Sequence, residues 1–117
     1  MRISSFGVAV LAVLISAIPS SALTYRELSK FPIEMKAAYI AGMGEGYSWS
    51  NVAAQSRGDA AIYCPPQKLG ISGSQYVKLL DDYIADKTHY RSDFSPPDSE
   101  VAFVLYLALL DAFPCQR

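Results

Sequence analysis

Hydrophobic positions recur at helical spacing in four segments of the chain, and polar capping signals mark where they begin. Thr24 and Glu27 form a capping box ahead of a short helix over residues 25–30. Pro32 ends that helix and suits the first turn of the next one, because proline lacks an amide that the first turn leaves unpaired. The apolar positions of this second helix are Ile33, Ala37, Ile40 and Tyr47.

Three glycines interrupt the second helix at Gly42, Gly44 and Gly46. Each costs about 1 kcal/mol in a helix interior relative to alanine. Gly42 and Gly46 lie four residues apart and therefore on one face, where a second backbone can approach closely. The cluster predicts either such a packing contact or a helix that frays at this point.

A looser stretch with two prolines covers residues 55–70, and a third helix follows it. Ser72 and Gln75 form a second capping box that opens this helix, which we expect to continue to about Lys87. Its predicted buried stripe is Tyr76, Leu79, Leu80, Tyr83 and Ile84. Its predicted solvent face is Lys78, Asp81, Asp82 and Asp86.

The last helix is the most apolar element. After a polar loop over residues 88–95, Ser95 and the two prolines that follow predict a cap and first turn for a helix over residues 97–112. Residues 101–110 contain no polar group except the Tyr106 hydroxyl. A small domain cannot enclose such a helix on all sides, so we expect part of its surface to form a homodimer interface. The residues predicted at that interface are Phe103, Tyr106 and Leu110.

The N-terminus has the three-part layout of a secretory signal peptide over residues 1–22. Arg2 supplies a positive charge, residues 6–18 carry none, and small residues precede a cleavage site after Ala22. The alternative is a membrane anchor, but a spanning helix needs about 20 apolar residues and this run is shorter. We therefore expect export, cleavage and a mature domain over residues 23–117 that is not held at the membrane.

The mature chain is short and nearly neutral. Its 95 residues suffice for one domain. With His89 neutral, nine basic and eleven acidic side chains give a net charge of −2. That charge provides no basic surface for phosphates, so nucleic acid is not an expected partner. The apolar fraction, 51% of the whole chain, argues against disorder.

Cys64 and Cys115 are the candidates for a covalent link. An exported chain with an even cysteine count is normally disulfide-bonded, because its compartment oxidises thiol pairs. The closed loop holds about 52 residues and contributes roughly 4 kcal/mol to stability on the chain-entropy model. The alternative, a redox or nucleophilic thiol site, lacks both a CxxC spacing and a nearby base. The predicted fold is a compact all-α bundle of about four helices with one disulfide.

Candidate catalytic residues are few. His89 is the only histidine, so any Ser-His-Asp or Cys-His arrangement and any metal site would depend on it. We interpret it as a solvated loop histidine. Asp81, Asp82 and Asp86 could supply a carboxylate pair for glycoside hydrolysis, but a charged helix face explains them without a further assumption. The sequence therefore predicts no enzyme activity, no metal and no cofactor.

Two short motifs frame the second half of the chain. Tyr-Cys-Pro at residues 63–65 is followed some fifty residues later by Phe-Pro-Cys at 113–115, with the helix over 75–84 between them. Further matching positions are Tyr39, Gly42, Gly46, Ala108 and Leu109. With these elements the chain resembles, over residues 35–115, the Rap/Tai family of small periplasmic immunity proteins. These proteins protect bacteria against cell-wall amidases delivered by type VI secretion.

The resemblance implies an all-helical fold, export to the periplasm, a disulfide between the two motif cysteines and frequent dimerisation. It also implies inhibition by occlusion, in which the immunity protein blocks the active-site groove of the amidase. The expected function is therefore that of a periplasmic immunity protein, and the expected partner is a secreted peptidoglycan amidase.

The loop over residues 87–97 is the predicted contact with that amidase, since it offers mixed chemistry on a short segment. Tyr90 and Phe94 are the predicted aromatic anchors. Arg91 and Asp93 are the predicted charges that select one partner over another. The other interpretation is an ordinary loop that connects two helices.

Two other functions stay open on the sequence. One is a periplasmic acid-stress chaperone, which exposes apolar surface when its carboxylates are protonated; eleven acidic residues and one histidine permit this. The other is a small periplasmic binding module that uses aromatic residues in or near loops, such as Trp49 and Tyr63, to hold a ligand. Otherwise these aromatic residues would form small satellite cores.

Overall fold

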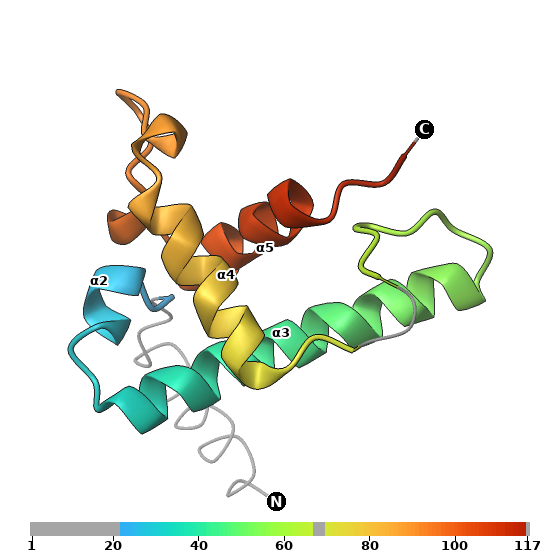
Figure 1. Ribbon diagram of the computed structural model, residues 1–117, viewed down its shortest axis with the longest axis horizontal. Coiled ribbons are helices and arrows are strands. Elements are labelled where there is room, and N and C mark those ends of the chain that lie inside the picture. The colour runs from blue at the N-terminus through green and yellow to red at the C-terminus, as the bar shows by residue number, and fades with distance from the viewer. Residues whose placement is uncertain (1–21, 67–69, 117) are drawn as a thin grey trace, which may run out of the picture.

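The computed structural model describes residues 22–66 and 70–116, and within these ranges it contains four α-helices and two short 3-10 helices (Figure 1). They are α2 (Tyr25–Leu28), α3 (Ile33–Ser56), α4 (Gly73–Ala85), η1 (Lys87–His89), η2 (Pro96–Asp98) and α5 (Val101–Ala112). The all-α prediction is confirmed. In these two ranges no helix is both long and apolar enough to cross a bilayer. The predicted signal peptide over residues 1–22 lies, apart from Ala22, outside the described residues.

Both predicted capping boxes are present. The Thr24 hydroxyl accepts from the Glu27 amide at 3.2 Å, and the Glu27 carboxylate accepts from the Thr24 amide at 3.2 Å. Ser72 and Gln75 repeat the arrangement at the start of α4. Both helices end two residues earlier than predicted. In α4 the reason is Asp86, whose extended backbone leaves the helix before the η1 turn.

The glycines of α3 behave differently from either prediction. The helix does not fray, and no neighbouring atom of the described chain lies within 4 Å of the space that a Cβ on Gly42 or Gly46 would fill. The close contact is made by Gly44 instead, against which the ring of Tyr76 on α4 lies. Gly44 lies one turn after the buried Ile40 and so faces the core. Gly42 and Gly46 are each two positions from Gly44, so they lie on the opposite side of the helix.

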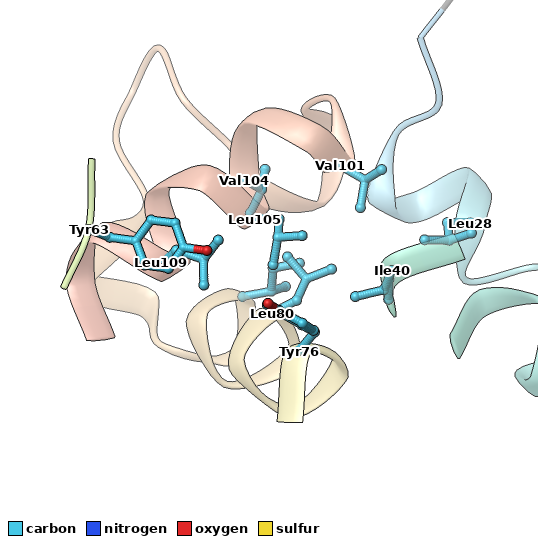
Figure 2. Close-up of a cluster of buried hydrophobic side chains, with 10 residues drawn as sticks. Leu28, Ile40, Tyr63, Tyr76, Leu80, Val101, Val104, Leu105 and Leu109 are labelled. Carbon is cyan, nitrogen blue, oxygen red and sulfur yellow. The ribbon is translucent and has the colours of Figure 1, made fainter. Parts of the chain in front are cut away.

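The predicted buried stripe of α4 is confirmed. Tyr76, Leu80 and Ile84 are buried, and Leu79 and Tyr83 lie at the margin of the core. Tyr63 and Leu109 lie at one end of the cluster, and Leu28 and Ile40 at the other (Figure 2). The core cluster consists of Leu28, Ile40, Tyr63, Tyr76, Leu80, Ile84, Val101, Val104, Leu105 and Leu109.

The last helix begins at Val101, four residues later than predicted. Pro96 and the two residues after it form η2, and the backbone then runs extended through residues 99–100. There it meets the N-terminal segment: the Tyr25 amide donates to the Ser99 carbonyl at 3.3 Å, and the Val101 amide to the Leu23 carbonyl at 2.9 Å. These hydrogen bonds with a distant segment hold residues 99–100 extended, although the local sequence favours a helix there.

A polar cluster joins the first three α-helices. The Tyr25 hydroxyl donates to the Asp81 carboxylate at 2.7 Å, and the Lys36 ammonium lies 3.2 Å from both groups. Burial and then the hydrogen bond to Asp81 raise the pKa of Tyr25. Asp81 is therefore half-buried rather than part of a solvent face as predicted, while Asp82 is exposed and paired with Lys78 at 2.6 Å.

The Cys64–Cys115 disulfide predicted from the sequence is present, with the two Cα atoms 4.9 Å apart. It joins the segment after α3 to the chain after α5. Two further contacts hold that segment. The Cys64 amide donates to the Phe113 carbonyl at 2.8 Å, and the buried Asn51 side chain donates to the Tyr63 carbonyl at 2.8 Å.

Candidate functional site

The chain between α4 and α5 extends away from the other helices as the orange arm of Figure 1. We call residues 86–99 the projection. At its start the Asp86 carboxylate accepts from the amide and the hydroxyl of Thr88, at 3.0 and 2.7 Å. Both bonds lower the pKa of Asp86, and the bond from the Thr88 hydroxyl has the larger effect. At its C-terminal end Asp98 accepts from the Arg26 guanidinium of α2 at 2.6 and 3.3 Å, which ties this end of the projection to the helical body.

His89 is folded back onto α4 instead of being solvated as predicted. Its side chain is 17% exposed, and its ring stacks on that of Tyr83 with centroids 3.7 Å apart. His89 Nδ1 lies 2.7 Å from the Tyr83 carbonyl and donates to it. Its Nε2 lies 3.7 Å from Asp86 and 3.9 Å from Asp111. The cause is the η1 turn, which reverses the chain directly after α4.

Tyr90 connects the projection to the end of α4. Its hydroxyl donates to the Ile84 carbonyl at 2.9 Å, and the Lys87 ammonium lies 4.4 Å from the centre of its ring. The hydroxyl is therefore already in use, and the ring is half-buried. Within the described chain Tyr90 therefore positions the projection, and its role as an anchor for a partner stays a prediction.

The tip of the projection is a tight turn. The Arg91 amide donates to the Phe94 carbonyl at 2.9 Å, and the Phe94 amide donates back to the Arg91 carbonyl at 3.2 Å. Ser92 and Asp93 form the two-residue turn between them. The side chains of Arg91 and Asp93 are exposed, whereas Phe94 is half-buried and turned toward α5.

Phe94 meets Phe103 of α5 edge to face, with ring centroids 6.0 Å apart. The two rings belong to a cavity of about 370 Å³, which we call the projection cavity. Its lining residues are Tyr83, Thr88, His89, Arg91, Asp93, Phe94, Phe103 and Leu107. The structure thus brings three residues predicted to bind a partner together with one predicted at a dimer interface.

The other two predicted interface residues lie farther along α5. Tyr106 and Leu110 are half-buried, and the Tyr106 ring lies 6.1 Å from that of Tyr47 on α3. Tyr47 also donates to the Ala102 carbonyl at 2.7 Å. Of the three residues predicted at a dimer interface, Phe103 is the most accessible, with 48% of its surface exposed.

Two lining residues, Tyr83 and Leu107, lie outside the predicted contact loop over residues 87–97, and two that lie inside it, Thr88 and His89, were not predicted as contacts individually. A local signal existed for one feature. Asp86 followed by Thr88 is a pattern in which a carboxylate accepts from the amide two residues later, which favours a tight turn after the helix.

Burial and then the charge of Asp111 raise the pKa of the Tyr83 hydroxyl.

The cavity combines aromatic walls with a rim of opposite charges, a chemistry that suits binding. Within the described ranges no three His, Cys, Asp or Glu side chains are placed to hold a metal ion, and the cysteines there are joined in the disulfide. Comparison of the chain with family models, with curated proteins and with solved structures finds no match.

Proposed function

We propose that this protein is a periplasmic immunity protein of the Rap/Tai type, which binds a secreted peptidoglycan amidase and blocks its active-site groove. The observation that carries the proposal is the projection: a fixed arm with exposed Arg91 and Asp93 at its tip and an aromatic cavity beside it. A convex arm of this kind fits a concave enzyme groove. The paired cysteine motifs support the family, because they are joined as the family pattern implies.

The projection is ordered before it meets a partner. Its backbone is held at Asp86, at Tyr90 and at Asp98, by bonds within the described chain. A segment that is already ordered loses less conformational entropy on binding, so more of the contact energy appears as affinity. Phe94 and Phe103 offer apolar area for an anchor, and the two tip charges offer partner selection.

Export is part of the proposal. A disulfide is retained in oxidising compartments and rare in a reducing cytosol, so the Cys64–Cys115 bond supports a periplasmic location. The layout of residues 1–22 supports cleavage on export.

The test uses a secreted cell-wall amidase, sought first among the products of the genes that neighbour the gene for this protein. Binding is measured by calorimetry, and protection by survival of cells that express the amidase in the periplasm. Replacing both tip charges in Arg91→Ala/Asp93→Ala should weaken binding by roughly 100-fold or more, as for contacts at the centre of an interface. The thermal melt should stay unchanged, because both side chains are exposed.

The matched control is Lys78→Ala/Asp82→Ala, which removes one basic and one acidic exposed side chain from α4. It should bind and protect like the parent. If the tip variant does so as well, the projection is not the contact. If no amidase binds, the immunity proposal fails, and protection of an aggregating client protein at acid pH then tests the chaperone function instead.

A further inference from the structure

The ring of His89 has one nitrogen in use and one open. Nδ1 lies 2.7 Å from the Tyr83 carbonyl, and because a carbonyl can only accept, Nδ1 carries a proton. In the neutral ring Nε2 therefore has a lone pair and no proton. Stacking on the Tyr83 ring holds this orientation. The Tyr83 hydroxyl itself stays neutral up to pH 8, since burial and then the charge of Asp111 raise its pKa.

Two carboxylates from different elements face this open nitrogen. Oδ2 of Asp86, at the end of α4, lies 3.7 Å from Nε2, while Oδ1 of the same residue accepts from Thr88. Oδ2 of Asp111, on α5, lies 3.9 Å from Nε2. A lone pair cannot donate to an oxygen, and both separations exceed the length of a hydrogen bond. In the neutral state neither carboxylate is therefore bonded to the ring.

The other charged groups near the ring are engaged elsewhere or exposed, within the ranges that the structure describes. Asp82 lines a second cavity, of about 250 Å³, with these groups, but its carboxylate is paired with Lys78 at 2.6 Å. The Lys87 ammonium lies over the ring of Tyr90. Arg91 lines the projection cavity with the histidine, and its side chain is exposed. The two carboxylates at Nε2 are therefore its nearest ionic partners.

A second proton on the ring changes this contact. It turns Nε2 into a charged donor, which attracts both carboxylates and forms shorter hydrogen bonds than a neutral donor does. Histidine is the side chain that ordinarily gains its charge between pH 8 and pH 5, where carboxyl groups are still charged. The Asp111 side chain is 66% exposed and borders the second cavity, so it has room to approach the ring.

We propose that His89 is a pH-sensitive latch, which on gaining its second proton bonds to Asp86 and Asp111 and so fixes the base of the projection to α5. A conformation with the ring between two carboxylates binds the proton better than one with the ring displaced. Falling pH therefore shifts the population toward the latched state. The latch does not depend on the proposed function; where the projection binds an amidase, it makes the order of the binding segment depend on pH.

The experiment measures amide hydrogen exchange of the disulfide-bonded protein at pH 8 and pH 5.5, expressed as protection relative to an unfolded peptide. Protection in residues 87–94 should rise by about three- to tenfold at the lower pH, relative to amides in the middle of α3. Asp111→Asn removes the partner on α5 and keeps the bonds between Asp86 and Thr88, so most of this gain should be lost. Glu45→Gln is the matched control, because it removes one exposed carboxylate from α3 and should keep the gain.

His89 is the only histidine, so nitrogen NMR of its ring gives a second measurement. The neutral ring should show its proton on Nδ1, and the gain in protection should follow the titration of the ring. A projection that gains no protection while the ring titrates overturns the proposal. So does a gain that persists in Asp111→Asn, or one that is lost in Glu45→Gln.

Discussion

The ring of Tyr76 lies against Gly44 and occupies the space that a Cβ at residue 44 would need. This contact brings α4 close to α3 at the middle of the long helix. Both residues are buried, and Tyr76 belongs to the central core cluster. Because the two helices are packed backbone to ring here, the site has no room for a larger residue.

Gly44→Ala should therefore destabilise the protein by about 1–3 kcal/mol, the usual cost of overpacking a core. Gly42→Ala is the control, since a Cβ there meets nothing within 4 Å and alanine favours a helix by up to about 1 kcal/mol. Urea denaturation of both variants measures the effect. Equal stability of the two would mean that Tyr76 moves aside without cost.

Asn51 holds the segment that leads to the disulfide. Its side chain donates to the Tyr63 carbonyl at 2.8 Å and accepts from the Ile62 amide at 2.7 Å. Asn51→Ala would leave two backbone groups without these partners and should lower the free energy of unfolding by about 1–3 kcal/mol. Gln55→Ala, one turn later and exposed, should change it by less than about 0.5 kcal/mol in the same titration.

The disulfide should contribute a large share of the stability. Cys64→Ser/Cys115→Ser opens a covalent loop between residues 51 positions apart and should reduce the free energy of unfolding by about 2–5 kcal/mol. Guanidinium titration compares the variant with the parent. The parent in reducing agent is the control and should match the variant; a parent that is insensitive to reduction would contradict the expectation.

Tyr90→Phe tests the positioning role of that residue. Loss of the hydrogen bond to the Ile84 carbonyl should speed amide hydrogen exchange in residues 87–94 and leave global stability nearly unchanged. Tyr39→Phe, whose side chain is exposed on α3, should leave exchange in the projection as it is. Unchanged exchange in Tyr90→Phe would show that Asp86 and Asp98 suffice to order the projection.

Acid should loosen the projection at its two ends. Hydrogen bonds from Arg26 and then Ser95 lower the pKa of Asp98, and those from Thr88 lower the pKa of Asp86. A carboxyl whose pKa is lower in the folded state stabilises that state fully above its ordinary pKa of 3.8, and less as pH falls below it.

Hydrogen exchange of the projection from pH 6 to pH 2.5, expressed at each pH as protection relative to an unfolded peptide, checks this expectation. Loss of protection should begin only below about pH 4. Asp98→Asn should show faster exchange already at pH 5 and a flatter response to acid. Loosening of the parent between pH 6 and pH 5 would contradict the assignment to these two carboxyl groups.

The sequence by itself determined the features that depend on neighbours a few residues apart. The capping boxes at Thr24 and Ser72 join residues three positions apart, so they form wherever the chain is helical. The buried stripe of α4 follows from its helical period. The disulfide followed from the cysteine count and the expected export, because a pair of thiols in an oxidising compartment is normally oxidised to a disulfide.

Only the tertiary structure decided the features that depend on distant segments. The last helix begins at Val101 because residues 99–100 pair with a segment some 76 positions earlier, at Thr24. Gly44, rather than the glycines on either side, meets Tyr76 because α4 crosses α3 at that residue. Neither contact can be predicted from residue spacing, because in both cases the contacting residue is distant in the sequence.

The candidate site shows the same division. The sequence named Arg91, Asp93 and Phe94 from their chemistry, and Phe103 from an apolar run, as parts of two different surfaces. The structure joins them in one cavity, because the turn after Ala85 folds His89 onto Tyr83 and carries Phe94 to α5. Residue types fix which side chains can bind, and the path of the backbone decides which of them stand together.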